Sequence, residues 1–200
     1  RATPYKRMGL LFSDPDRLVA LARSAGPVQV VLSGKAHPRD EAGKELIRHV
    51  VDVARRLGGE VPVLYVPGHS MELNRLLCSG SDIWLNTPRK PHEASGTSGM
   101  KAAVNGVPSL SVLDGWWAEG HVEGVTGCLV PFEPDPVTGF PVHPDEFSRA
   151  LAARIQHVLN DPAKARSMGE AGRRRVEETF SWRAIAAETI DLYEQLLRTR

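Results

Sequence analysis

The sequence predicts an α/β protein whose core is a doubly wound parallel sheet of the Rossmann-like kind. Through the first 130 residues, apolar runs of strand length alternate with helical patterns. The runs are continuously apolar, which is typical of parallel strands that helices cover on both faces. After this region the chain has helical patterns without strands, so we expect a C-terminal helical segment.

The individual elements follow from these patterns. Strands are expected at Val28–Leu32, Val61–Val66, Ile83–Asn86, Ser109–Leu113 and Cys128–Val130. Helices are expected at Asp16–Ala25, Asp40–Leu57, Met71–Leu77 and Ser98–Asn105. Glycines and prolines at positions 58–59 and 106–108 provide helix stop signals.

The C-terminal part begins with a proline-rich stretch, Pro131–Pro144, which is expected to be a surface loop. Three helices should follow, and the first carries an apolar stripe. The second starts at Asn160–Pro162 and the third at Ser181. The stripe of the first helix is Phe147, Leu151, Ile155 and Val158, and that of the third is Ile185, Leu192 and Leu196. We assign residues 1–143 to a Rossmann-like cofactor- or donor-binding domain and residues 144–200 to helices that pack on the same domain.

Composition excludes several classes of protein. The net charge of +1 gives no reason to expect a nucleic-acid partner, and no apolar run approaches the ~18 residues of a membrane span. Two cysteines do not form a disulfide framework, so we expect a reducing, cytoplasmic environment. The seven histidines and two cysteines show no ligand spacing, so no metal site is expected.

The segment Glu93–Lys101 has the composition of a binding site. It combines a carboxylate, two hydroxyls, two glycines and a lysine at the start of a predicted helix. Glycines let the backbone approach an anion, and helix N-termini bind anions. Two further loops, with Gly34-Lys35 and Pro67–His69, follow other strands, and ligands of such sheets bind at these strand ends. His37 and His69 are interpreted as ordinary loop residues, and Trp116 and Trp117 as core or cleft-edge aromatics.

Over residues 1 to about 120 the sequence resembles the α-glucan (glycogen/starch) phosphorylases. The similarity is carried by Asp82–Pro88, Glu93–Lys101, Ala102–Gly106 and Leu113–Trp117. It implies the second domain of a two-domain glycosyltransferase fold of the GT-B type. The strand that should precede Arg1 is missing, as is the N-terminal partner domain. The resemblance further implies that phosphate splits an α-1,4-glucan to give glucose 1-phosphate.

The resemblance also implies roles for particular residues. Lys101 stands where the family carries pyridoxal phosphate as a Schiff base, with Gly96, Thr97, Ser98 and Gly99 around its phosphate. The implied catalytic residues are Arg1, Lys6, Lys35 and Glu93. The first three would bind the substrate phosphate, and Glu93 would hold a sugar hydroxyl. The alternatives without a functional role are that Lys101 is a solvated surface lysine and that Glu93 is a carboxylate stabilised by the N-terminus of the helix. The loop Pro67–Met71 departs from the family pattern.

From about Val125 onward the sequence is similar instead to nucleotide-sugar glycosyltransferases such as bacterial glycogen synthase. One alternative is therefore an ADP-glucose-dependent glucosyltransferase that uses Lys35 and Arg1 on a diphosphate. Another is an isolated half that only binds a ligand. The sequence does not indicate an oligomeric state.

Overall fold

The computed structural model describes residues 1–130 and 144–199. Its strands are β1 (Val30–Ser33), β2 (Val63–Val66), β3 (Trp84–Asn86), β4 (Ser109–Ser111) and β5 (Gly127–Leu129). Its α-helices are α1 (Pro15–Ala25), α2 (Glu41–Leu57), α3 (Met71–Gly80), α4 (Thr97–Val104), α5 (Trp117–Gly120), α6 (Pro144–Leu159), α7 (Pro162–Thr179) and α8 (Trp182–Arg198). Two 3₁₀ turns, η1 (Pro4–Lys6) and η2 (Leu10–Phe12), lie near the N-terminus.

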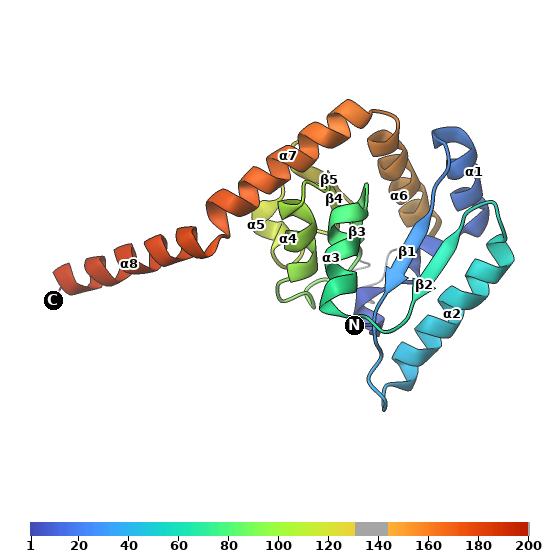
Figure 1. The fold of residues 1–200 in the computed structure, drawn as a ribbon, viewed down its shortest axis with the longest axis horizontal. Coiled ribbons are helices and arrows are strands. Elements are labelled where there is room, and N and C mark those ends of the chain that lie inside the picture. The colour runs from blue at the N-terminus through green and yellow to red at the C-terminus, as the bar shows by residue number, and fades with distance from the viewer. Residues whose placement is uncertain (131–143, 200) are drawn as a thin grey trace.

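The five predicted strands are all present, and every pairing is parallel. They form two hydrogen-bonded groups, with strand order β1-β2 in one and β3-β4-β5 in the other. Helices flank both groups (Figure 1). The α/β, Rossmann-like class is therefore confirmed, but β1 and β3 are not hydrogen-bonded to each other as they would be in one continuous sheet.

Four of the five strands are shorter than the apolar runs that predicted them, and β5 has the predicted length but begins one residue earlier. Pro62 lacks a backbone N–H, so β2 begins after it, although its carbonyl still accepts a hydrogen bond from the Val30 N–H at 2.9 Å. The helix starts agree with the sequence because side chains cap them. Asp14, Asp40, Ser70, Asp161 and Ser181 each accept a hydrogen bond from a backbone N–H of the first turn.

The main core lies where α1, α2 and α6 meet the strands. Its buried members include Leu18 and Leu21 of α1, Val50 and Val53 of α2, and Leu110 of β4. The stripe predicted for α6 is buried there at Leu151, Ile155 and Val158. The side chain of Phe147 and the loop 131–143 lie outside the described residues.

A second, smaller core fixes α7 against α4. Trp116 and Trp117 are buried with Ala103 and Val176, so the tryptophans belong to the core. Close approach of the two helices requires glycine at one position. A Cβ at Gly169 of α7 would lie only 1.8 Å from the carbonyl oxygen of Gly106, just beyond α4.

Helix α8 extends away from the rest of the molecule (Figure 1) and has no buried residue. Its apolar side chains, Ile185, Leu192 and Leu196 among them, are exposed, and Trp182 is 91% exposed. α6 and α7 lie against the strands, whereas α8 does not share that packing. Among the described residues, no helix is both long and apolar enough to cross a membrane.

Replacing Gly169 by alanine is expected to lower the free energy of unfolding by about 1–3 kcal/mol, because the added Cβ overlaps the Gly106 backbone. Gly80→Ala is the matched control, since it also lies in a helix and a Cβ there meets no atom within 4 Å. Urea unfolding of both variants tests the packing of α7 on α4. Equal midpoints for Gly169→Ala and the unmodified chain would contradict it.

Candidate functional site

Residues 1–7 cross the carboxyl ends of β1 and β3 and connect the two groups of strands. The Ala2 N–H donates to the carbonyl of Lys35, beyond β1, at 3.0 Å. At the other end, the Arg7 guanidinium donates to the carbonyls of Thr87 and Pro88, beyond β3, at 2.8 and 2.7 Å. The predicted loops after these strands therefore do meet at one edge of the molecule.

Arg7 is more enclosed than a surface arginine. Burial, and to a lesser extent the charge of Arg89, lowers its pKa to about 10. Its backbone has a φ of 48°, a left-handed conformation that only a minority of non-glycine residues adopt. The resemblance did not give Arg7 a role, and its contacts show that it anchors the segment that carries Lys6.

Lys6 and Glu93 form an ion pair that joins this segment to the loop before α4. The Glu93 side chain is 6% exposed and that of Lys6 is 22% exposed, so solvent only partly screens the pair. The Lys6 ammonium also lies 5.4 Å from the centre of the Tyr5 ring. Two of the predicted catalytic residues are thus in direct contact although 87 positions separate them.

Glu93 is held in place by Asp114, which follows β4. One Asp114 oxygen accepts from the Glu93 N–H and the other from the Gly115 N–H, each at 3.0 Å. The Trp116 N–H donates to the Ser95 carbonyl at 2.7 Å, which fixes the same loop again. Sequence reasoning assigned no role to Asp114. The available signal was an Asp-Gly pair directly after an apolar strand.

Glycines shape the start of α4. Gly96 precedes the helix with a φ of 79° and contributes no side-chain cap. The Gly99 N–H donates to the Gly96 carbonyl at 2.9 Å, which leaves the N–H groups of Thr97 and Ser98 available to an anion. Gly99 is buried against Trp116, and a Cβ there would lie 2.7 Å from the indole nitrogen. The predicted cradle, Gly96 to Gly99, is therefore an uncapped helix start packed tightly on an aromatic side chain.

Lys101 lies in the last turn of α4, and both it and Thr97 are exposed. Among the described residues, no carboxylate lies within ion-pair distance of Lys101. Its positive charge acts on the thiol of Cys78 in α3. Burial raises the pKa of that thiol, and the charge of Lys101 opposes the rise. The structure does not bring Lys101 into contact with the Lys6–Glu93 pair.

Arg1 and Lys35 are exposed at the same edge. Of the loop histidines, His69 lies 3.1 Å from the Ser33 hydroxyl through Nδ1, and His37 accepts from the Arg39 N–H. Both take part in local loop contacts.

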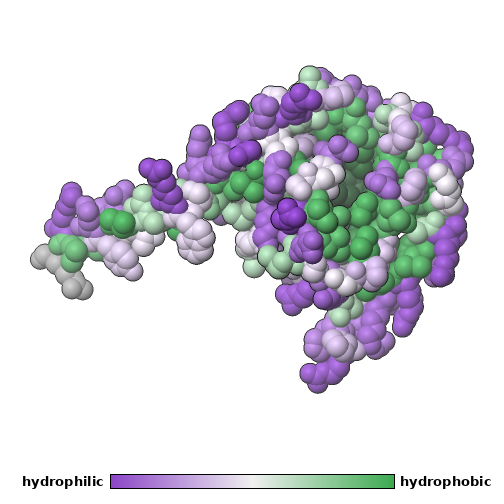
Figure 2. All heavy atoms as spheres, in the orientation of Figure 1, coloured by the Kyte–Doolittle hydropathy of each residue, from purple (hydrophilic) through white to green (hydrophobic). Residues whose placement is uncertain are grey.

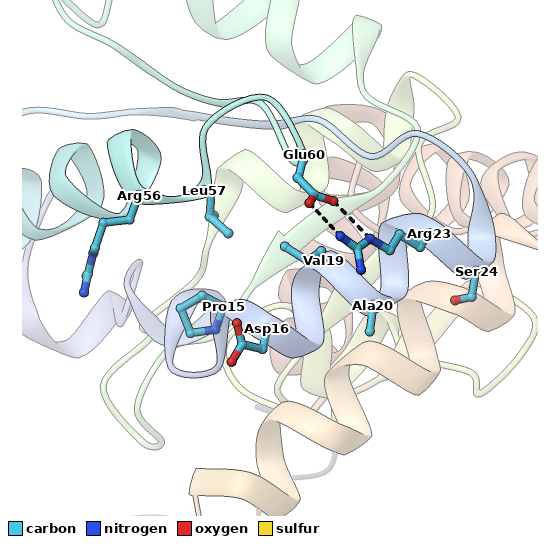
Figure 3. Close-up of a pocket in the computed structure, with 9 residues that line it drawn as sticks. All are labelled: Pro15, Asp16, Val19, Ala20, Arg23, Ser24, Arg56, Leu57 and Glu60. Carbon is cyan, nitrogen blue, oxygen red and sulfur yellow. Dashed lines mark hydrogen bonds and ion pairs between the residues drawn. The ribbon is translucent and has the colours of Figure 1, made fainter.

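A hollow of about 850 Å³ lies elsewhere (Figure 3). It is formed by α1 and the end of α2, and an Arg23–Glu60 ion pair crosses it with both side chains largely exposed. Glu60 precedes β2, so the hollow faces the amino ends of the strands, away from Lys6 and Glu93. In the described part of the chain, no cluster of histidine, cysteine or acidic side chains could hold a metal ion.

Comparisons with known proteins identify two sets of relatives. A family model described as carbohydrate phosphorylase matches residues 16–123. A maltodextrin phosphorylase from Thermococcus litoralis is 47% identical over 131 residues, which is 65% of this chain and 16% of that protein. The chain therefore spans about a sixth of the length of this relative.

A second set of relatives matches nearly the whole chain, including its C-terminal part. An alpha-maltose-1-phosphate synthase from Mycobacterium tuberculosis is 28% identical over 180 residues, or 90% of this chain and 43% of that protein. The solved structure of a sucrose-phosphate synthase from Thermosynechococcus elongatus aligns with 100% of this chain and 44% of its own, with a TM-score of 0.70 and 27% identity. The fold is thus that of one half of a GT-B glycosyltransferase.

The glycine-shaped start of α4, Glu93 and Asp114 all fall within the residues that the phosphorylase model matches. Because the match covers more than half of the sequence, the chain belongs to the carbohydrate phosphorylase family.

Proposed function

We propose that this chain is the cofactor-binding half of a cytoplasmic α-glucan phosphorylase, which splits α-1,4-glucan with phosphate to give glucose 1-phosphate. The observation that carries the proposal is the Lys6–Glu93 pair beside the uncapped start of α4. A cation, a buried carboxylate and a helix N-terminus thus lie close together at the carboxyl ends of the strands. This combination suits a sugar that is being joined to a phosphate.

The residues present fit pyridoxal phosphate. Gly96 leaves the first N–H groups of α4 uncapped, and Thr97 adds a hydroxyl, so a phosphate can be held there. Lys101 follows Thr97 by one helical turn and has no carboxylate partner among the described residues, so its amine is available for a Schiff base. When bound, the cofactor would supply a phosphate group able to exchange a proton with the substrate phosphate.

The cationic residues would make the meeting of two phosphates possible. Two dianions in contact repel each other unless cations surround them, and Arg1, Lys6 and Lys35 lie at this edge. In the free chain Glu93 partly neutralises Lys6. An arriving phosphate competes for the Lys6 ammonium, and Glu93 is then free to accept a hydrogen bond from a sugar hydroxyl.

A nucleotide-sugar glucosyltransferase is the second candidate. It is favoured by the similarity to alpha-maltose-1-phosphate synthase over 90% of the chain and by the full-length alignment with sucrose-phosphate synthase. In this scheme Lys35 and Arg1 would bind the diphosphate of ADP-glucose, and Glu93 would bind the donor sugar. Both schemes need a second domain to close the cleft, so little turnover is expected from this half alone.

The cofactor assignment predicts one reactive lysine. After incubation with pyridoxal phosphate and borohydride reduction, peptide mass mapping should find the adduct chiefly on Lys101. Lys101→Ala should remove that adduct, whereas Lys44→Ala, on the distant helix α2, should leave it unchanged. Labelling spread evenly over the lysines would overturn the assignment.

The competition at Lys6 predicts two variants with opposite effects on phosphate binding. Lys6→Gln should weaken binding of inorganic phosphate by about tenfold or more, because it removes a charged donor. Glu93→Gln should strengthen binding, because it removes the competing anion. NMR titration measures both, with the exposed Lys90→Gln as the control. Parallel changes in the two variants would contradict the competition.

The two candidate functions predict different ligands. A phosphorylase half should bind pyridoxal phosphate and should not bind ADP-glucose measurably without it, whereas a nucleotide-sugar enzyme should bind ADP-glucose in the absence of cofactor. Calorimetry with each ligand, on the chain and on its Lys101→Ala variant, distinguishes them. ADP-glucose binding that is unaffected by Lys101→Ala would favour the second candidate.

A further inference from the structure

His69 is held by a serine whose own hydrogen bonds decide which ring nitrogen carries the proton. The Ser33 hydroxyl, at the end of β1, donates to the Val66 carbonyl at 3.0 Å and lies 3.1 Å from His69 Nδ1. A hydroxyl has one proton to donate, and a carbonyl oxygen can only accept. Because the Ser33 proton goes to Val66, the Ser33 oxygen accepts from His69, so the proton of the neutral imidazole is on Nδ1.

His37, in the loop after β1, provides the opposite case. The Arg39 N–H donates to His37 Nδ1 at 3.2 Å, so this nitrogen carries a lone pair and the His37 proton is on Nε2. In water, neutral histidine side chains favour the Nε2–H form. His37 therefore keeps the ordinary tautomer, whereas Ser33 imposes the less common one on His69.

The consequence is an unprotonated Nε2 on His69. The side chain is partly exposed, and within residues 1–130 and 144–199 no group forms a hydrogen bond with this nitrogen. While the ring is neutral, Nε2 can only accept a hydrogen bond. The contact between Ser33 and His69 thus leaves one directed acceptor available to a ligand.

This acceptor borders the cationic edge of the molecule. Ser33 ends β1 and is followed directly by Gly34 and the exposed Lys35. A Cβ at Gly34 would lie 3.8 Å from the Arg1 carbonyl carbon, so Arg1 lies against the same turn. The serine that orients His69 is therefore next to the residues expected to bind phosphate.

The predicted site residues supply mostly hydrogen-bond donors. Figure 2 shows apolar, green residues over the part of the molecule that holds β1 and β2, with hydrophilic residues around them, so the loops supply the polar groups. The side chains of Arg1, Lys6 and Lys35 can only donate while they are charged. Glu93 accepts, but it is already paired with Lys6. The Nε2 lone pair of His69 adds an acceptor that no side chain of this set occupies.

We infer that His69 is a specificity-determining residue whose Nε2 accepts a hydrogen bond from a hydroxyl group of the ligand at this edge. A lone pair repels an oxygen that carries no hydrogen, so this residue favours ligands that present a hydroxyl there. Under the proposed function, on which the choice of ligand rests, that hydroxyl belongs either to the α-glucan or to the P–OH group of hydrogen phosphate. The tautomer itself follows from Ser33 and does not depend on that function.

Nitrogen-15 NMR of the histidine side chains tests the tautomer directly, because protonated and unprotonated ring nitrogens have well-separated shifts. The cofactor-free chain is measured at mildly alkaline pH, where imidazoles are neutral. His69 should be in the Nδ1–H form and His37 in the Nε2–H form. Ser33→Ala should convert His69 to the Nε2–H form, and Ser33→Thr, which keeps a hydroxyl, should preserve Nδ1–H. An Nε2–H form of His69 in the unmodified chain would overturn the inference.

Titration with two probes identifies the hydroxyl. Inorganic phosphate should move the His69 Nε2 resonance if P–OH is the partner, and maltotriose should do so if a sugar hydroxyl is. His69→Ala should weaken binding of that same probe by about two- to tenfold, the loss expected for one neutral hydrogen bond. Ser33→Ala should act similarly through the tautomer, and Ser33→Thr should restore binding. His157→Ala, which removes an exposed histidine of α6, is the control and should leave binding unchanged.

Failure of this inference can be told apart from failure of the proposed function. If neither probe moves the Nε2 resonance, or if His69→Ala binds both probes as well as the unmodified chain does, the ligand assignment to His69 is wrong. All these measurements use the chain without pyridoxal phosphate. A missing adduct on Lys101 would therefore reject the proposed function without changing the His69 tautomer, whereas an Nε2–H form of His69 would leave the proposed function untouched.

Discussion

The hydrogen bonds that residues 1–7 make to the ends of β1 and β3 are the constraint on which the site depends. Without them the two groups of strands share only helices and side-chain packing, and the loops beyond β1 and β3 have no fixed spacing. Arg7 bonds to two consecutive carbonyls, so the segment is held at its end as well as at Ala2. Lys6 lies between these anchors, and its position opposite Glu93 follows from them.

A second level of support lies under Glu93. A buried carboxylate is costly unless it is paired, and here Lys6 supplies the charge while Asp114 fixes the backbone. Asp114 is itself buried and satisfied by two N–H groups. The tryptophan core beneath Gly99 fixes the start of α4 against the same loop. The loop before α4 is therefore held from several sides, which suits the proposed role of this edge in binding phosphate groups.

The class of fold was readable from the sequence because continuous apolar runs and caps such as Asp14, Asp40 and Ser70 depend on local chemistry. The direct contact between Lys6 and Glu93 was not predicted, although a resemblance assigned both residues to one site, because nothing local relates residues 87 positions apart. Asp114 and Arg7 were not assigned roles because they bond to backbone groups, which residue types do not identify. For Asp114, the Asp-Gly pair after an apolar strand was the available signal. The division of the strands into two groups was also unpredictable, because apolar runs indicate strands but not which edges pair.

Helix α8 has a consequence for how the protein can be observed. Of the four tryptophans, Trp116 and Trp117 are buried, Trp84 is partly buried and Trp182, the first residue of α8, is almost fully exposed. An exposed indole emits at longer wavelength than a buried one and is readily quenched by iodide or acrylamide. The quenchable, red-shifted part of the fluorescence therefore belongs mainly to Trp182. Any molecule or domain that covers the start of α8 should shift the Trp182 emission to shorter wavelength, so the fluorescence of this residue reports binding at α8.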